Sequence, residues 1–135
     1  AAQWCVSRQP GSEAARSVLR LLRPPSVMSF CVERARSSAD PEQRARWVKL
    51  LSEIADARAV EWAKEFAADP ARFVRYCGGL VAVELQFREE LSEEDYIALT
   101  ECFDASGHPE LLEISDRLRA EHDLDASTEQ GPGAS

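Results

Sequence analysis

The prolines of this 135-residue chain separate stretches in which apolar residues recur every three or four positions. That spacing places the apolar side chains on one face of an α-helix. Two of the breaks, Asp40-Pro41 and Asp69-Pro70, join a residue that caps helix N-termini to a proline, which is tolerated in the first helical turn. Ser92 and Pro109 predict two further helix starts, and Ser106-Gly107 predicts a helix end. The pattern predicts about seven short helices joined by short breaks.

Each predicted helix carries one apolar stripe that it cannot bury alone, so the helices have to stack. We expect an all-α fold, arranged as an armadillo-like or irregular helical array, with the helical domain over residues 12–122. Residues 1–11 are expected to form an irregular lead-in. Residues 123–135, in which Ser, Thr, Gly, Pro and Gln follow Asp125, are expected to form a disordered tail. The predicted core residues are Leu19, Leu22, Val27, Phe30, Val48, Leu51, Ile54, Trp62, Phe66 and Phe73.

One stretch, residues 80–87, fits two kinds of secondary structure. Its apolar residues alternate in part with a period of two, which is typical of a strand. A lone strand would have no partner elsewhere in the chain, so a helix is favoured. The preceding pair Gly78-Gly79 is expected to bend or break the helix that begins at Pro70.

Charge is distributed unevenly along the chain. Residues 1–50 carry nine Arg or Lys and four Asp or Glu, a balance of +5, whereas residues 51–135 carry seven and twenty, a balance of −13. The net charge of −8 argues against nucleic acid as the main partner. No run of 18 apolar residues is present, so no membrane span is expected. The basic N-terminal half is suited to an acidic protein surface.

The four cysteines, Cys5, Cys31, Cys77 and Cys102, contain no C-x-x-C pair, and most lie in apolar stretches. They indicate buried, reduced thiols in a cytoplasmic protein. Cys102 and His108 are close enough in sequence to pair as nucleophile and base, although a core cysteine and a turn histidine explain them more simply. The sequence shows neither zinc-type spacing nor a Gly-rich phosphate loop after a strand. We therefore expect no enzyme, no metal and no cofactor.

Three arginines of the first predicted helix form a basic stripe beside its apolar face. Like charges at this spacing destabilise a helix by a few tenths of a kcal/mol, so we expect an acidic partner to offset them. That partner is either the acidic second half of the same chain or an acidic patch on another protein. The residues proposed from charge to bind a partner are Arg16, Arg20, Arg23, Arg34 and Arg36.

Two short motifs resemble the GTPase-binding region of formins. Leu21-Leu22-Arg23-Pro24-Pro25-Ser26-Val27 resembles a proline-containing motif near the start of that region, where a helix begins just after Pro-Ser. Glu61-Trp62-Ala63-Lys64-Glu65-Phe66 resembles the family's Trp-x-x-x-Phe helix, which is followed, as here, by a glycine (Gly78 or Gly79) and a Leu-rich segment. An amphipathic helix, here over residues 44–57, lies between the two motifs. The similarity covers roughly residues 17–120.

The resemblance implies an armadillo-like array at the N-terminal regulatory end of a diaphanous-related formin, which binds a Rho-family GTPase and contributes to autoinhibition. We therefore expect a protein-interaction domain that binds a Rho-family small GTPase, an autoinhibitory segment or both in the regulation of actin assembly. Two alternatives remain open: a helical oligomerisation or scaffold domain unrelated to GTPases, and an enzyme fragment with Cys102 as nucleophile. Because the sequence lacks an initiator methionine, it could also belong to a longer protein.

Overall fold

The structure, a computed structural model, describes residues 25–129 of the chain. The predicted lead-in, the predicted helix after Ser12 and the predicted core residues Leu19 and Leu22 lie outside the described residues. Within residues 25–129 all regular structure is helical, which confirms the predicted all-α fold for this part of the chain. The α-helices are α3 (Pro25–Ser37), α4 (Pro41–Ile54), α5 (Val60–Ala67), α6 (Arg72–Phe87), α7 (Glu93–Ser106) and α8 (Pro109–Glu129), and a short 3-10 helix, η1 (Ala57–Ala59), precedes α5.

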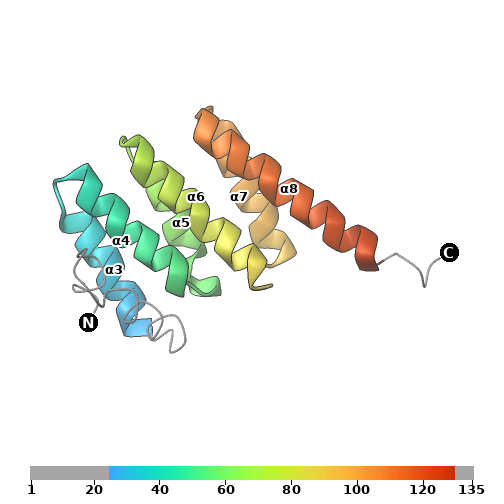
Figure 1. Ribbon diagram of the computed structural model, residues 1–135, viewed down its shortest axis with the longest axis horizontal. Coiled ribbons are helices and arrows are strands. Elements are labelled where there is room, and N and C mark those ends of the chain that lie inside the picture. The colour runs from blue at the N-terminus through green and yellow to red at the C-terminus, as the bar shows by residue number, and fades with distance from the viewer. Residues whose placement is uncertain (1–24, 130–135) are drawn as a thin grey trace, which may run out of the picture.

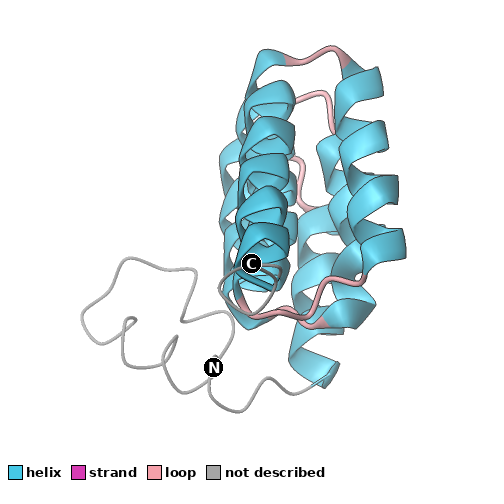
Figure 2. Cartoon of the chain, turned by 90° about the vertical axis from the view of Figure 1, so that its right-hand side faces the viewer, coloured by secondary structure: helices cyan, strands magenta, loops and turns pink. Residues whose placement is uncertain are grey.

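The helices form three antiparallel hairpins, α3–α4, α5–α6 and α7–α8, which stack side by side. Figure 1 shows α4, α6 and α8 nearly parallel at the front, with α3, α5 and α7 behind them. The view in Figure 2 separates these two layers. The central helix, α6, contacts α4 and α8 in its own layer and α5 in the other. The predicted helical array is therefore confirmed, and its stacking is that of an α-solenoid, in which each unit contacts its neighbours.

Several helix ends match the local signals in the sequence. Asp40 caps α4 through a hydrogen bond of 3.2 Å from the Glu42 N–H to its carboxylate. Ser92 caps α7 by accepting a hydrogen bond of 3.1 Å from the Asp95 N–H. Gly107, with φ of 71°, adopts the left-handed conformation that ends α7. These caps satisfy backbone groups that a helix cannot pair within itself.

The predicted start of α6 is wrong by two residues. The helix begins at Arg72 and not at Pro70. Asp69 accepts a hydrogen bond of 2.8 Å from the Ala71 N–H, so it forms a turn ahead of the helix and does not cap it. Its carboxylate also binds Arg44 of the preceding hairpin, a contact that local sequence spacing does not reveal.

The pair Gly78-Gly79 does not break α6, which also includes residues 80–87, as favoured. Instead, the two glycines allow close packing on two sides. A Cβ atom on Gly78 would lie 2.8 Å from the backbone nitrogen of Ala67 in α5, and a Cβ atom on Gly79 would collide with the Ile114 side chain in α8. The absence of side chains at these positions lets α5 and α8 approach α6.

The last helix is longer than predicted. α8 continues to Glu129, past the predicted domain boundary at residue 122, so the first part of the expected tail is helical. Residues 130–135 lie outside the described residues. The last buried residue of α8 among residues 109–125 is Leu118, so the end of the helix extends beyond the packed core.

The core lies between the two layers and contains most of the predicted residues. Val48, Leu51, Ile54 and Phe66 are buried, and Val27 and Trp62 pack against the core from its edge. Two predictions are wrong: Phe30 is 38% exposed and Phe73 is 74% exposed. Phe30 lies at the edge of α3, where its ring meets Trp47 edge-on with centroids 5.6 Å apart. Phe73 lies on the outer side of α6, a helix with apolar residues on both sides.

Candidate protein-interaction surface

The outer side of α6 carries a continuous row of apolar side chains. Their spacing of three and four residues places them on one face of the helix. Phe73 is 74% exposed, Tyr76 40% and Phe87 84%. Cys77, Leu80 and Val83, which lie between these aromatic residues, are half-buried. Scattered apolar residues are normal on a protein surface, but large exposed ones gathered on one helix face indicate a site of interaction. We name this row the α6 stripe; it consists of Phe73, Tyr76, Cys77, Leu80, Val83 and Phe87.

The first half of the α6 stripe forms one wall of a groove between α4 and α6. This α4–α6 groove has a volume of about 720 Å³. Its apolar lining comes from the stripe together with Ala45 and Ala71, and its charged lining includes three cations and two carboxylates. Burial raises the pKa of the Cys77 thiol to about 11, against a smaller opposing effect of Lys49, so this thiol is protonated at neutral pH. The charged residues are Asp40, Glu42, Arg46, Lys49 and Arg72.

The second half of the stripe borders a different groove, between α6 and α8. This α6–α8 groove has a volume of about 510 Å³. Val83 and Phe87 supply its apolar lining, and Arg117 is its one cation. Four carboxylates surround these residues, so the groove is acidic. They belong to Glu84, Glu89, Glu121 and Asp125.

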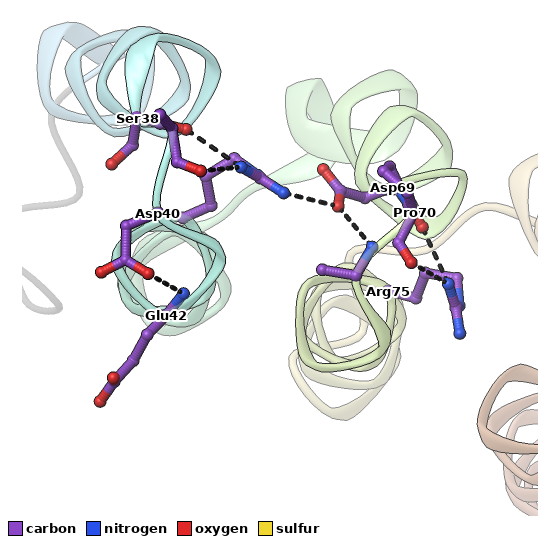
Figure 3. Close-up of polar contacts among 9 residues, drawn as sticks. Ser38, Asp40, Glu42, Asp69, Pro70 and Arg75 are labelled. Carbon is purple, nitrogen blue, oxygen red and sulfur yellow. Dashed lines mark hydrogen bonds and ion pairs between the residues drawn. The ribbon is translucent and has the colours of Figure 1, made fainter.

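The loops that begin α4 and α6 are held by an arginine clamp (Figure 3). Arg44 donates hydrogen bonds of 3.1 Å to the carbonyl oxygens of Ser38 and Ala39, six and five residues before it. Its other terminal nitrogen lies 3.2 Å from the Asp69 carboxylate, in the loop of the next hairpin. The clamp therefore fixes the start of α4 against the start of α6.

A second arginine repeats this arrangement one hairpin further on. Arg75 donates hydrogen bonds of 3.1 and 2.9 Å to the carbonyl oxygens of Asp69 and Pro70, again six and five residues before it. Its Nε–H donates to the Glu110 carboxylate at 2.7 Å, in the first turn of α8. The side chains of both clamps are largely buried. Together they set the spacing of α4, α6 and α8, and so the width of the two grooves.

The opposite end of α6 is tied to its neighbours as well. Arg88, which follows α6, donates hydrogen bonds to the carbonyl oxygens of Ser52, Glu53 and Ala55 at the C-terminus of α4. A cation at this place also interacts favourably with the helix dipole. The Gln86 side-chain amide donates to the Leu118 carbonyl of α8 at 2.8 Å. The α6 stripe is thus displayed on a helix that is fixed at both ends.

The basic residues predicted to bind a partner lie elsewhere or outside the described residues. Arg16, Arg20 and Arg23 are not described. Arg36 pairs with Glu65 on α5 at 2.6 Å and with Glu33 at 3.0 Å, and the hydrogen bond from Arg36 lowers the pKa of Glu65. Arg34 lies over the Phe30 ring, 5.2 Å from its centroid. Neither Arg34 nor Arg36 lines the α4–α6 or the α6–α8 groove.

The residues that the sequence offers as a nucleophile and a base, Cys102 and His108, are not brought together in the described part of the chain. Cys31 is buried, and Cys77 and Cys102 are half-buried thiols. Within the described residues, 25–129, no hydrogen bond joins Cys102 to His108, although both lie at the same end of the third hairpin. The same range holds no group of three or more side chains suited to bind a metal ion. None of its helices is both long and apolar enough to cross a bilayer.

Helical periodicity alone does not predict the α6 stripe, because it places Phe73 on the core face of the helix. A signal was nevertheless available in the small residues. Gly78 and Gly79 mark the sides on which α5 and α8 approach, and the large residues Phe73 and Phe87 lie on the remaining side, where they are largely exposed.

Compared with known proteins, the chain matches no protein-family model, no curated protein and no solved structure.

Proposed function

We propose that this chain is a protein-interaction domain that binds its partner on the α6 stripe. The observation that carries the proposal is the exposure of three aromatic residues, Phe73, Tyr76 and Phe87, along one helix that is fixed at both ends. Aromatic side chains in or beside a groove commonly supply most of the energy of a protein interface. A rigid helix lowers the entropic cost of ordering such side chains on binding.

The formin resemblance implies a particular partner: a Rho-family GTPase, or an autoinhibitory segment, in the regulation of actin assembly. In this form of the proposal the motif over residues 61–66 has a structural role. Phe66 is buried and Trp62 packs against the core, so a GTPase would contact other residues. The α6 stripe would supply apolar contacts, and the exposed Arg34 would supply a cation at the edge of the array.

The experiment is a binding assay of the full chain against a panel of Rho-family GTPases, each loaded with GDP or a GTP analogue. We expect one GTP-loaded member to bind and Phe87→Ser to weaken its binding by about tenfold or more, as for an interface anchor. Ile97→Ser is the matched control, because Ile97 is 45% exposed on α7 and lines neither groove. If no loaded GTPase binds a folded chain, the GTPase part of the proposal is wrong.

Self-association is a second candidate, because an exposed apolar stripe can also pair with the same stripe of another copy. A helical oligomerisation or scaffold domain of this kind needs no GTPase. Its signature is a melting temperature that rises with protein concentration, and a dimer that Phe73→Ser dissociates. A chain that sediments as a monomer at all concentrations would exclude this candidate.

A further inference from the structure

We infer that the α6 stripe binds an amphipathic helix of another protein, with basic residues of that helix lying over the acidic α6–α8 groove. This inference rests on the proposed interaction function and adds the chemistry of the partner. Helices commonly bind by laying an apolar face into a groove, with anchors at spacings of three and four residues. The α6 stripe offers a complementary surface with the same spacing.

The length of the stripe sets the length of the partner helix. From Phe73 to Phe87 it extends over about 21 Å, at a helical rise of roughly 1.5 Å per residue. A partner segment of about 15 residues, or four turns, would cover that length. The larger, more apolar α4–α6 groove lies at one end, where Tyr76, Leu80 and Ala45 can receive an apolar anchor.

The charges around the stripe differ between its two ends. In the α4–α6 groove, Arg46 pairs with Glu42 at 2.8 Å and Lys49 with Glu53 at 3.8 Å, so much of the charge there is neutralised. Arg72 is the remaining cation of that groove, and it forms no ion pair with another described residue. This end is therefore close to neutral and favours apolar contacts.

Three of the four carboxylates in the α6–α8 groove are not neutralised by an ion pair within the described chain, and Arg117 is the one cation that lines the groove with them. Glu89, Glu121 and Asp125 form no ion pair with another described residue, and Glu84 pairs with Arg88 at 3.4 Å. The partner should therefore place Lys or Arg at this end. A second copy of the chain would fit poorly, because Arg72 is the one unpaired cation that its α4–α6 groove could place opposite these carboxylates.

The test uses two synthetic helical peptides of the same apolar pattern. The basic peptide carries four lysines in its last two turns, and its acidic twin carries glutamates at those positions. We expect the full chain to bind the basic peptide at least about tenfold more tightly than the twin, and the difference to shrink with added salt. Binding should also slow alkylation of Cys77, which lines the α4–α6 groove; the reaction is followed at alkaline pH, because this thiol is protonated at neutral pH.

Charge reversal on the chain makes the test specific to the groove. Glu121→Lys combined with Asp125→Lys should lower the affinity of the chain for the basic peptide by about tenfold and raise its affinity for the acidic twin. The matched control, Glu101→Lys with Glu113→Lys, changes the net charge equally at exposed positions that line neither groove, and should leave both affinities within about twofold.

Three results would overturn the inference. Equal affinity for the two peptides would mean that the partner need not be basic, but it would not contradict the proposed interaction function. Binding of the basic peptide only after Leu19→Asp and Leu22→Asp would show that residues 12–23 of the chain itself cover the stripe. If neither peptide binds, the GTPase binding assay separates two cases. If a GTPase binds and Phe87→Ser weakens its binding, only the helical nature of the partner is wrong. If no GTPase binds either, the proposed interaction function is wrong as well.

Discussion

Both sides of α6 carry apolar residues, but one side is buried and the other is exposed. Val74, Val81 and Leu85 on the inner side are fully buried, whereas Phe73 and Phe87 on the outer side are largely exposed. The inner side packs closely because its glycines let α5 and α8 approach. An apolar residue therefore stabilises the fold only where the molecule supplies a neighbour to pack against it. Where it supplies none, the same residue type is available for binding.

The largest expected difference between the two sides is in stability. Leu85→Ala should lower the free energy of unfolding by about 2–5 kcal/mol, because it leaves a cavity in the core. Phe87→Ala removes a larger side chain but should change the same quantity by no more than about 0.5 kcal/mol. Urea denaturation of both variants measures the contrast. A loss above that limit for Phe87→Ala would mean that the stripe is covered within the chain itself.

The next effect concerns the clamp that places α6 against α8. Burial acts to raise the pKa of Glu110, but a backbone hydrogen bond and the contact with Arg75 outweigh it and leave that pKa below its ordinary value. Arg75→Gln should cost about 2–3 kcal/mol of stability, because buried acceptors lose their partner. It should also raise the pKa of Glu110, as followed by NMR titration. Arg72→Gln is the control on the outer side and should be nearly neutral.

A smaller effect is expected at the two glycines. Gly78→Ala gains about 1 kcal/mol of helix propensity but places a Cβ atom against the backbone of α5. Overpacking of this kind costs about 1–3 kcal/mol, so a net loss of stability is expected. Gly79→Ala meets only the ends of flexible side chains, including that of Ile114, and should be close to neutral. Equal melting temperatures for the two variants would contradict the expectation that α5 packs more tightly on Gly78 than α8 packs on Gly79.

The smallest effect is a pH dependence beside the acidic end of the stripe. His122 Nε2 lies 2.7 Å from Glu93, and its ring stacks on Tyr96. The hydrogen bond with Glu93 raises the pKa of His122 above its ordinary 6.5, against the opposing effect of burial. The stabilisation is therefore complete below about pH 6.5 and is lost as pH rises through the raised pKa. Melting temperatures should show this pH-dependent component in the native chain and lack it in His122→Gln; Glu93→Gln should remove it too.

Most helix ends could be predicted from the sequence because their signals are local. Asp40, Ser92 and Gly107 act on backbone groups within three residues of themselves. The start of α6 could not, because Asp69 is engaged by Arg44, 25 residues away. The charge of Arg36 predicts contact with a partner protein, yet this side chain pairs with Glu65, 29 residues along the chain. Interactions between hairpins decide such cases, and they depend on how the helices stack.

The candidate surface was the least predictable feature. Helical periodicity identifies apolar faces but does not say which face a neighbouring helix will cover. It therefore predicts Phe73 in the core, whereas this side chain is exposed. The repeat of the arginine clamps is also hidden in the sequence. Arg44 and Arg75 each follow an Asp-Pro pair, but the distances differ, from three residues after Pro41 to five after Pro70, because α6 starts two residues late.

The arginine clamps also determine how the array would respond to a pulling force. The first two hairpins are joined by Arg44 with Asp69, by Arg36 with Glu65, and by Arg88 at the end of α4. The third hairpin is joined to the second by Arg75 with Glu110 and by Gln86, over a less extensive interface. Under tension along the stack, the joint between α6 and α8 would therefore yield first. A partner helix bound across the interface between α6 and α8 would hold the two helices together. Binding at this surface would therefore raise the force needed to separate the hairpins.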